Sequence, residues 1–113
     1  MRDIEAAVEA GNEKAILALD MYEYRILKYI GAYTAVLGGV DIIVFTGGVG
    51  ENQTGTRERI CKQLAFMGVT FNAEANKVRG EEIEISGADS KVHVVVIPTD
   101  EEMMIAQDTA ALV

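Results

Sequence analysis

The chain has 113 residues, of which half are hydrophobic and a quarter charged, and its formal net charge is −8. That length suits one domain or one lobe of a larger protein, and it is enough to bury a real core. The acidic balance argues against sequence-independent binding of nucleic acid and against an anionic membrane as partner. It leaves a nucleotide possible, because a bound Mg²⁺ balances the charge of its phosphates.

Cys61 is the only cysteine, so no disulfide can form within the chain and nothing indicates an oxidising compartment. The first residues lack the basic-then-apolar pattern of a signal peptide, and no apolar run approaches the length of a membrane span. We therefore expect a cytoplasmic protein.

Two helices are expected before the first strand. Residues 3–10 predict a short helix and residues 12–37 a long one, which glycines 38 and 39 end. Large residues recur along the long helix at steps of three or four, so we expect them to share one packing face. They are Leu19, Tyr22, Ile26, Tyr29, Ile30, Tyr33 and Leu37. Because tyrosine is favoured where one end stays wet, part of this face is also a candidate interface.

The remaining elements are expected in the order β-α-β-β-β-α. Short strands are expected at residues 42–45, 69–71, 82–85 and 92–97, with helices at 54–65 and 99–111 and a turn or short helix within 72–80. The run 92–97 is nearly continuous and apolar, which is typical of a strand covered on both faces. Thr99 and Glu102 have the spacing of a capping box for the last helix. This order predicts an α/β fold, with a mixed sheet flanked by helices.

Residues 46–52 carry three glycines directly after an apolar strand, and we expect a glycine-rich loop there. Without a Cβ, backbone can lie close to a base or a phosphate and keep its N–H groups free to donate. The loop is not a dinucleotide fingerprint, because no carboxylate lies about twenty residues on. It is not a P-loop, because Glu51-Asn52 replaces Lys-Ser/Thr, and the companion motifs of a protein kinase are absent. The alternative is a tight turn, with Asn52 capping the following helix.

Three segments together resemble the acetate kinases of the acetokinase family. Residues 45–52 are similar to the family's Phe-Thr-Ala-Gly-Ile-Gly-Glu-Asn, residues 76–80 to Asn-Lys-x-Arg-Gly, and residues 96–102 to Val-Ile-Pro-Thr-Asn-Glu-Glu. Their order and spacing agree, and the resemblance covers essentially the whole chain. It implies a ribonuclease H-like, actin-like ATPase lobe, with residues 1–113 as a single domain that forms the C-terminal nucleotide-binding lobe.

The resemblance also implies site residues. Glu101 matches the family's Mg²⁺-linked glutamate, and the ATP contacts would be Gly48, Val49, Gly50, Glu51, Asn52 and Arg2. From the residues alone, stabilisation of a helix N-terminus is the better explanation of the acidic run 100–102. Arg2 equally reads as an exposed terminal residue, since the family's preceding aspartate is missing.

His93 and Cys61 are expected to be structural. No nucleophile or carboxylate motif flanks His93, and Cys61 lies among apolar helix residues. The family's catalytic histidine belongs upstream of this segment, so no catalytic residue is assigned.

The resemblance implies phosphoryl transfer from ATP to acetate, giving ADP and acetyl phosphate, by a homodimeric enzyme. Acetate, its pocket and the catalytic groups would belong to an N-terminal lobe that this chain lacks, so we expect no turnover from the chain alone. Three alternatives remain: a lobe of a butyrate or propionate kinase, a self-associating fragment that binds no ligand, and a separate nucleotide-binding regulator.

Overall fold

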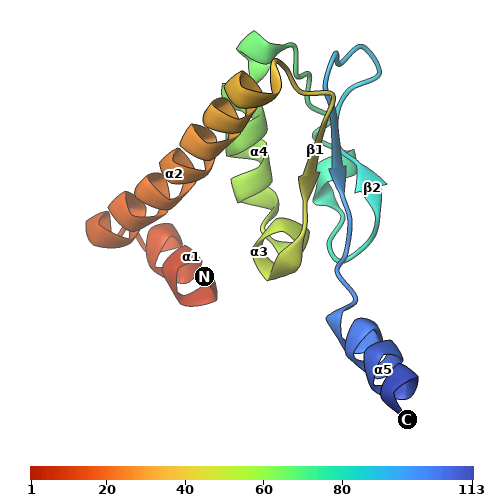
Figure 1. Cartoon of the computed structure of the whole chain (residues 1–113). Helices are drawn as coiled ribbons and strands as arrows, with labels where there is room; N and C mark the ends of the chain where they lie inside the picture. The colour runs from red at the N-terminus through yellow and green to blue at the C-terminus, as the bar shows by residue number, and fades with distance from the viewer.

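The computed structural model describes residues 1–113, and Figure 1 shows how the elements are arranged. The α-helices are α1 (Arg2–Glu9), α2 (Glu13–Leu37), α3 (Gly47–Asn52), α4 (Thr54–Gln63) and α5 (Glu101–Leu112). The strands are β1 (Ile42–Phe45), β2 (Ile83–Glu84) and β3 (His93–Val96), and 3₁₀ turns lie at Ala65–Met67 and Ala75–Lys77. No helix combines the length and the apolar character needed to cross a membrane.

The sheet is mixed, as expected, with strand order β1-β3-β2. β1 runs parallel to β3, with Ile42 opposite His93 and Phe45 opposite Val96. β2 runs antiparallel to β3. Because β1 and β3 are parallel, their carboxyl ends meet at one edge of the sheet, and α3 and the segment leading to α5 both start from that edge (Figure 1).

The strand expected at 69–71 does not form, and only Phe71 makes a bridge, to Ser86. Thr70 bonds to side chains of the turn before β3. Its backbone N–H donates to the Ser90 hydroxyl at 3.0 Å, and its hydroxyl donates to Asp89 at 2.8 Å. The segment is thus tied to the turn before β3 through side chains, and its backbone bonds to residues 85 and 87 form a single bridge rather than a longer ladder.

The core lies between α4 and the sheet. Its fully buried members come from α4, the segments that follow it and β3: Ile60, Cys61, Leu64, Val69, Ile85, Val92, Val94 and Val96. Alternate residues of β3 lie outside this cluster, with His93 exposed and Val95 only partly buried. The expectation that residues 92–97 are covered on both faces is therefore wrong for this chain, because its helices supply one covering layer.

Helix α2 begins after Asn12, whose side-chain oxygen accepts from the backbone of Lys14 and Ala15, and ends at Gly38 with φ +78°. Its expected packing face is only partly confirmed. Leu19 is buried, but the tyrosines and Leu37 are 41–74 % exposed. A charged residue, Glu23, provides a buried contact to α4 that the apolar periodicity did not predict.

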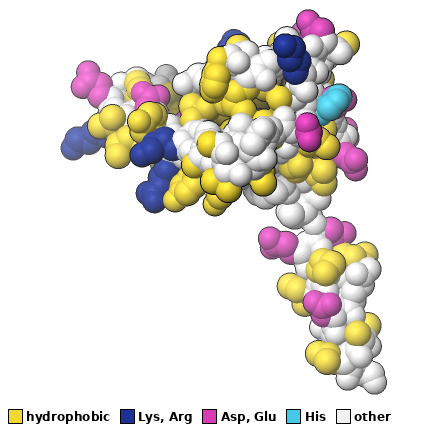
Figure 2. All heavy atoms as spheres, turned by 45° about the horizontal axis from the view of Figure 1, so that its top comes forward, with side chains coloured by type: hydrophobic (Ala, Val, Ile, Leu, Met, Phe, Trp, Pro, Cys, Tyr) yellow, Lys and Arg dark blue, Asp and Glu magenta, His cyan; other side chains and the backbone are white.

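Helix α5 projects away from the body, and Figure 2 shows hydrophobic side chains on the surface of this projecting helix. None of its residues is buried. The predicted start at Thr99 is wrong: the N-cap is Asp100, which accepts from the Met103 N–H at 3.1 Å, and Thr99 bonds elsewhere. The capping box with Glu102 does not form.

Candidate functional site

The glycine segment forms a short helix, α3, and the expected loop is wrong. Gly47 has φ +73°, which lets the chain turn from β1 into the helix without side-chain strain. The ends of α3 are then fixed by tertiary and local bonds. The Asn52 amide donates to the Gly48 carbonyl at 3.0 Å, and the Gln53 N–H donates to the Val49 carbonyl at 2.9 Å.

Beside α3 lies a hollow of about 370 Å³ with no hydrophobic lining residue. It is formed by two segments that are far apart in sequence but adjacent at the edge of the sheet. The lining residues are Gly47, Gly48, Thr99, Asp100, Glu101 and Glu102. We call it the glycine–glutamate hollow, because it brings the predicted nucleotide segment and the predicted metal ligand into one place.

The two walls of the hollow are joined by the side chain of Glu51. Its carboxylate accepts from the Thr99 backbone N–H at 2.7 Å and from the Thr99 hydroxyl at 2.9 Å. These bonds stabilise the charged form and lower the pKa of Glu51. The carboxylate therefore faces a protein partner, while its predicted role was a nucleotide contact.

Gly48 and Gly50 differ in whether the fold requires a glycine at that position. A Cβ on Gly50 would lie 3.0 Å from the Phe45 carbonyl carbon, so this glycine permits close packing of α3 on β1. A Cβ on Gly48 would meet no atom within 4 Å, so the fold itself would accept a side chain there. Of the two, only Gly48 lines the hollow.

Of the other predicted ligand residues, only Glu101 lines the hollow. Val49 faces an apolar groove between α2 and β1. Asn52 is exposed at the end of α3 and does not cap α4, whose N-cap residue is Gln53. Arg2 is exposed at the start of α1 and does not line the hollow. Glu101 is exposed at the start of α5 and lines the hollow.

Sequence reasoning missed Arg57. This residue of α4 is fully buried, and its guanidinium donates to carbonyls of α3 and of residues 76 and 78. The signal that could have found it is the motif at residues 76–80, because this segment contains Asn76 and Val78, which bind the Arg57 guanidinium.

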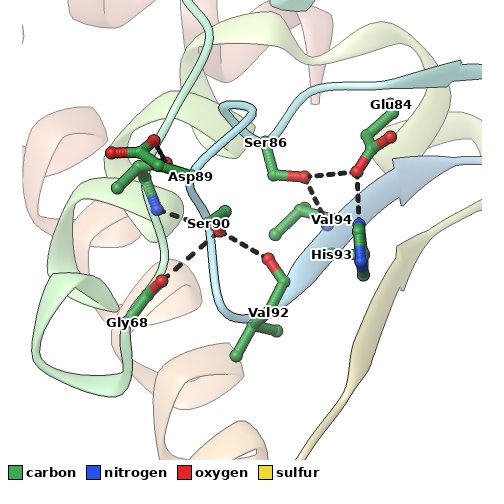
Figure 3. A network of polar contacts seen from close by, with 9 residues as sticks. Gly68, Glu84, Ser86, Asp89, Ser90, Val92, His93 and Val94 are labelled. Carbon is green, nitrogen blue, oxygen red and sulfur yellow. Dashed lines mark hydrogen bonds and ion pairs between the residues drawn. The ribbon is translucent and has the colours of Figure 1, made fainter.

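Cys61 takes the core position that was expected, whereas His93 is exposed on β3 beside a carboxylate. The His93 ring nitrogen Nδ1 lies 2.5 Å from Glu84 Oε1 on the exposed side of the sheet, and Ser86 donates to the same oxygen at 3.0 Å (Figure 3). These bonds lower the pKa of Glu84. Cys61 is buried, and burial raises the pKa of its thiol to about 12, so it is a poor nucleophile.

Known proteins are similar to this chain over nearly its whole length. A sequence model of the Acetokinase family matches residues 1–107. The acetate kinase of Phocaeicola vulgatus is 69 % identical over 112 residues, which cover 99 % of this chain and 28 % of that protein. The chain thus spans 28 % of the length of the curated relatives it matches.

Solved structures resemble it over the same extent. The crystal structure of Porphyromonas gingivalis acetate kinase has a TM-score of 0.88 and 58 % identity, covering 97 % of this chain and 28 % of that one. A propionate kinase from Francisella tularensis has a TM-score of 0.81 and 33 % identity, covering 94 % of this chain and 27 % of that one. With a family match over nearly its whole length, this chain belongs to the acetokinase family.

Proposed function

We propose that residues 1–113 are the C-terminal nucleotide-binding lobe of a cytoplasmic phosphotransferase that converts ATP and acetate to ADP and acetyl phosphate. The observation that carries this proposal is the glycine–glutamate hollow, where exposed glycine backbone faces a free carboxylate. Phosphoryl transfer depends mainly on positioning and on charge neutralisation. This lobe would supply nucleotide contacts and a metal contact, and the rest of the protein would bind acetate.

In this proposal the nucleotide lies against the start of α3. Gly48 has no side chain to block the approach and no protein atom near its Cβ position. Gly50 and the Asn52 amide act by shaping α3, since one packs on Phe45 and the other bonds to the Gly48 carbonyl. Arg2 lies at the start of α1, so it would contact the nucleotide from outside the hollow.

The residues present fit a magnesium ion held by a single carboxylate. Asp100 is occupied as the N-cap of α5, and no three His, Cys, Asp or Glu side chains are grouped to hold a metal. Mg²⁺ keeps most of its waters and often takes only one or two carboxylates. Glu101 would hold the ion, which when bound neutralises charge on the phosphates.

A segment exchange tests the proposal. Residues 1–107 of this chain would replace the matching segment of P. gingivalis acetate kinase, to which the chain is 58 % identical. We expect the exchanged enzyme to make acetyl phosphate from ATP and acetate, and the isolated 113-residue chain to make none. A folded exchanged enzyme without turnover, or turnover by the isolated chain, would contradict the proposal.

The likeness to a propionate kinase supports a second candidate, a lobe of a kinase for a longer acyl substrate. Because the hollow lies on the nucleotide side, acyl choice would be set outside this chain. Exchange of the same segment into the Francisella propionate kinase should therefore leave that enzyme's preference unchanged. A shift toward acetate would show that this lobe contributes to acyl choice.

We further propose that the exposed face of α2 contributes to a homodimer contact of the whole protein. Tyr29 and Tyr33 stack there, with ring centroids 6.1 Å apart, and Lys28 lies over the Tyr24 ring. Sedimentation of the chain, with Tyr29→Ser as the variant, tests this. Calorimetric titration of the chain with Mg²⁺-ATP separates the nucleotide-binding lobe proposed above from the alternative, a self-associating fragment that binds no ligand.

A further inference from the structure

Arg57 is a buried cation without a carboxylate partner. Its side chain is 0 % exposed, and all of its guanidinium N–H groups donate to neutral oxygens. Nε donates to the Asn76 side chain at 2.8 Å. Nη1 donates to the Gly50 and Glu51 carbonyls at 3.0 and 2.8 Å, and Nη2 to the Asn76 and Val78 carbonyls, both at 2.7 Å.

These acceptors explain how the cation is tolerated. Isolated buried charges are strongly unfavourable, and burial here lowers the pKa of Arg57. The Gly50 and Glu51 carbonyls lie at the C-terminal end of α3, where free carbonyls carry partial negative charge. The guanidinium therefore replaces the missing hydrogen bonds of one short helix while its other edge is held by Asn76 and Val78.

Asn76, which binds the other edge of the Arg57 guanidinium, is itself held in place by a hydrogen bond. The Asn76 side chain accepts from Arg57 and donates to the Thr54 carbonyl at 2.9 Å, which fixes the orientation of its amide. The Gly80 N–H also donates to the Glu51 carbonyl at 3.3 Å. The segment 76–80 thus supports the end of α3 through Arg57 and through the Gly80 N–H, although none of its residues lines the hollow.

Helix α3 depends on such support. It has six residues, three of them glycine, and glycine disfavours helix by about 1 kcal/mol relative to alanine. From this geometry we infer that Arg57 is a positioning residue for the nucleotide: by binding the end of α3, it fixes where Gly48 presents its backbone to the hollow. This inference rests on the proposed function.

The test compares Arg57→Lys with Arg59→Lys. Lysine at 57 keeps the charge but cannot bridge two pairs of carbonyls. Arg59 lies two residues further along α4 and bonds to Glu23 on α2, away from α3. In the 113-residue chain we expect amide exchange in residues 49–53 to accelerate at least about tenfold for Arg57→Lys and to stay unchanged for Arg59→Lys.

The exchanged enzyme supplies the readout that general destabilisation would not move. Because small misplacements of a bound group are costly, we expect Arg57→Lys to raise the KM for ATP at least about tenfold, with the KM for acetate unchanged. Asn76→Ala, which keeps the arginine but removes the acceptor of Nε, should shift the ATP KM in the same direction. It provides the comparison should Arg57→Lys fail to fold.

The outcomes separate the two proposals. An unsubstituted exchanged enzyme that makes no acetyl phosphate overturns the proposed function and this inference with it. A working enzyme in which both variants keep the ATP KM and the exchange rates of residues 49–53 overturns the role of Arg57 alone. Equal effects of Arg57→Lys and Arg59→Lys would also overturn it.

Discussion

The carboxylate of Glu51 and the Thr99 residue are joined by two hydrogen bonds, 2.7 and 2.9 Å long, to the same oxygen. One partner ends α3, and the other precedes α5. A bond from the Ile97 N–H to the Phe45 carbonyl lies just before it. Beyond the backbone pairing of the strands, the half-buried side chain of Glu51 therefore provides a second link between the two walls of the hollow.

This link should depend on pH. The bonds to Thr99 lower the pKa of Glu51 below its ordinary value of 4.5. Stability gained from the charged form is thus present above that ordinary value and is lost as the pH falls through the lowered pKa. We expect Glu51→Gln to melt at a lower temperature than the parent chain at pH 7, with the difference shrinking below pH 4.5.

Glu102→Gln is the control for this experiment, because Glu102 is exposed at the same end of α5 and makes no hydrogen bond to α3. Thermal unfolding of the three proteins across the acidic range provides the measurement. A constant difference between Glu51→Gln and the parent chain at every pH would argue that protonation of this carboxylate is not involved.

The two central glycines should respond in opposite ways to alanine. In Gly50→Ala the new Cβ would press on the Phe45 backbone, and overpacking of this kind costs about 1–3 kcal/mol. In Gly48→Ala the methyl group meets open space, and removing glycine from a helix contributes roughly 0.5–1 kcal/mol of stability. Denaturant titration should thus rank Gly48→Ala above the parent chain and Gly50→Ala below it.

A bulkier group at Gly48 tests binding separately from folding. Gly48→Val should weaken Mg²⁺-ATP binding in the exchanged enzyme while leaving the fold intact, because a Cβ at this position meets no neighbouring atom within 4 Å. Calorimetric titration gives the affinity, and circular dichroism gives the fold. Unchanged affinity for the nucleotide would place the ligand away from α3.

Removal of the proposed metal ligand should show in the metal dependence. In the exchanged enzyme Glu101→Gln should raise the Mg²⁺ concentration needed for half-maximal rate by roughly 10-fold or more, since the ion has one protein carboxylate in this proposal. Glu102→Gln, beside it in the hollow, should have a smaller effect. If the two variants require the same Mg²⁺ concentration, Glu101 is not the ligand.

Helix α5 should be the least protected helix of the 113-residue chain. It has 12 residues and none is buried, and isolated helices of that length are marginal in water. Its amides should exchange with solvent faster than those of α4 by orders of magnitude. Protection equal to that of α4, at a concentration where the chain is monomeric, would contradict this description.

Periodicity and end signals predicted those elements whose limits are set by local residues. Asn12, Gly38 and the apolar spacing between them determine α2, and the limits of β1 follow from a run of four apolar residues. Helix α3 could not be predicted in this way, because its glycines disfavour helix and its ends are completed by distant groups. The buried Arg57 is the clearest of these, and nothing in local sequence distinguishes it from Arg59.

The resemblance to a family predicted which two segments lie together, and it did not separate the places of their individual residues. It placed segments 45–52 and 96–102 together, and their parallel strands end at one edge of the sheet. It could not separate Gly48, which faces the hollow, from Gly50, which packs on Phe45, because both are the same residue in one motif. The two glycines differ in the atoms that surround them, and those contacts are set by the tertiary structure.

The Arg57 arrangement has a consequence for mutational surveys of such enzymes. Every hydrogen on its guanidinium is already committed to carbonyl or amide oxygen inside the protein, so none is left to neutralise a phosphate. Loss of activity on its replacement would mimic loss of a substrate-binding arginine. Kinetics alone would then assign to the active site a side chain that stands one layer behind it.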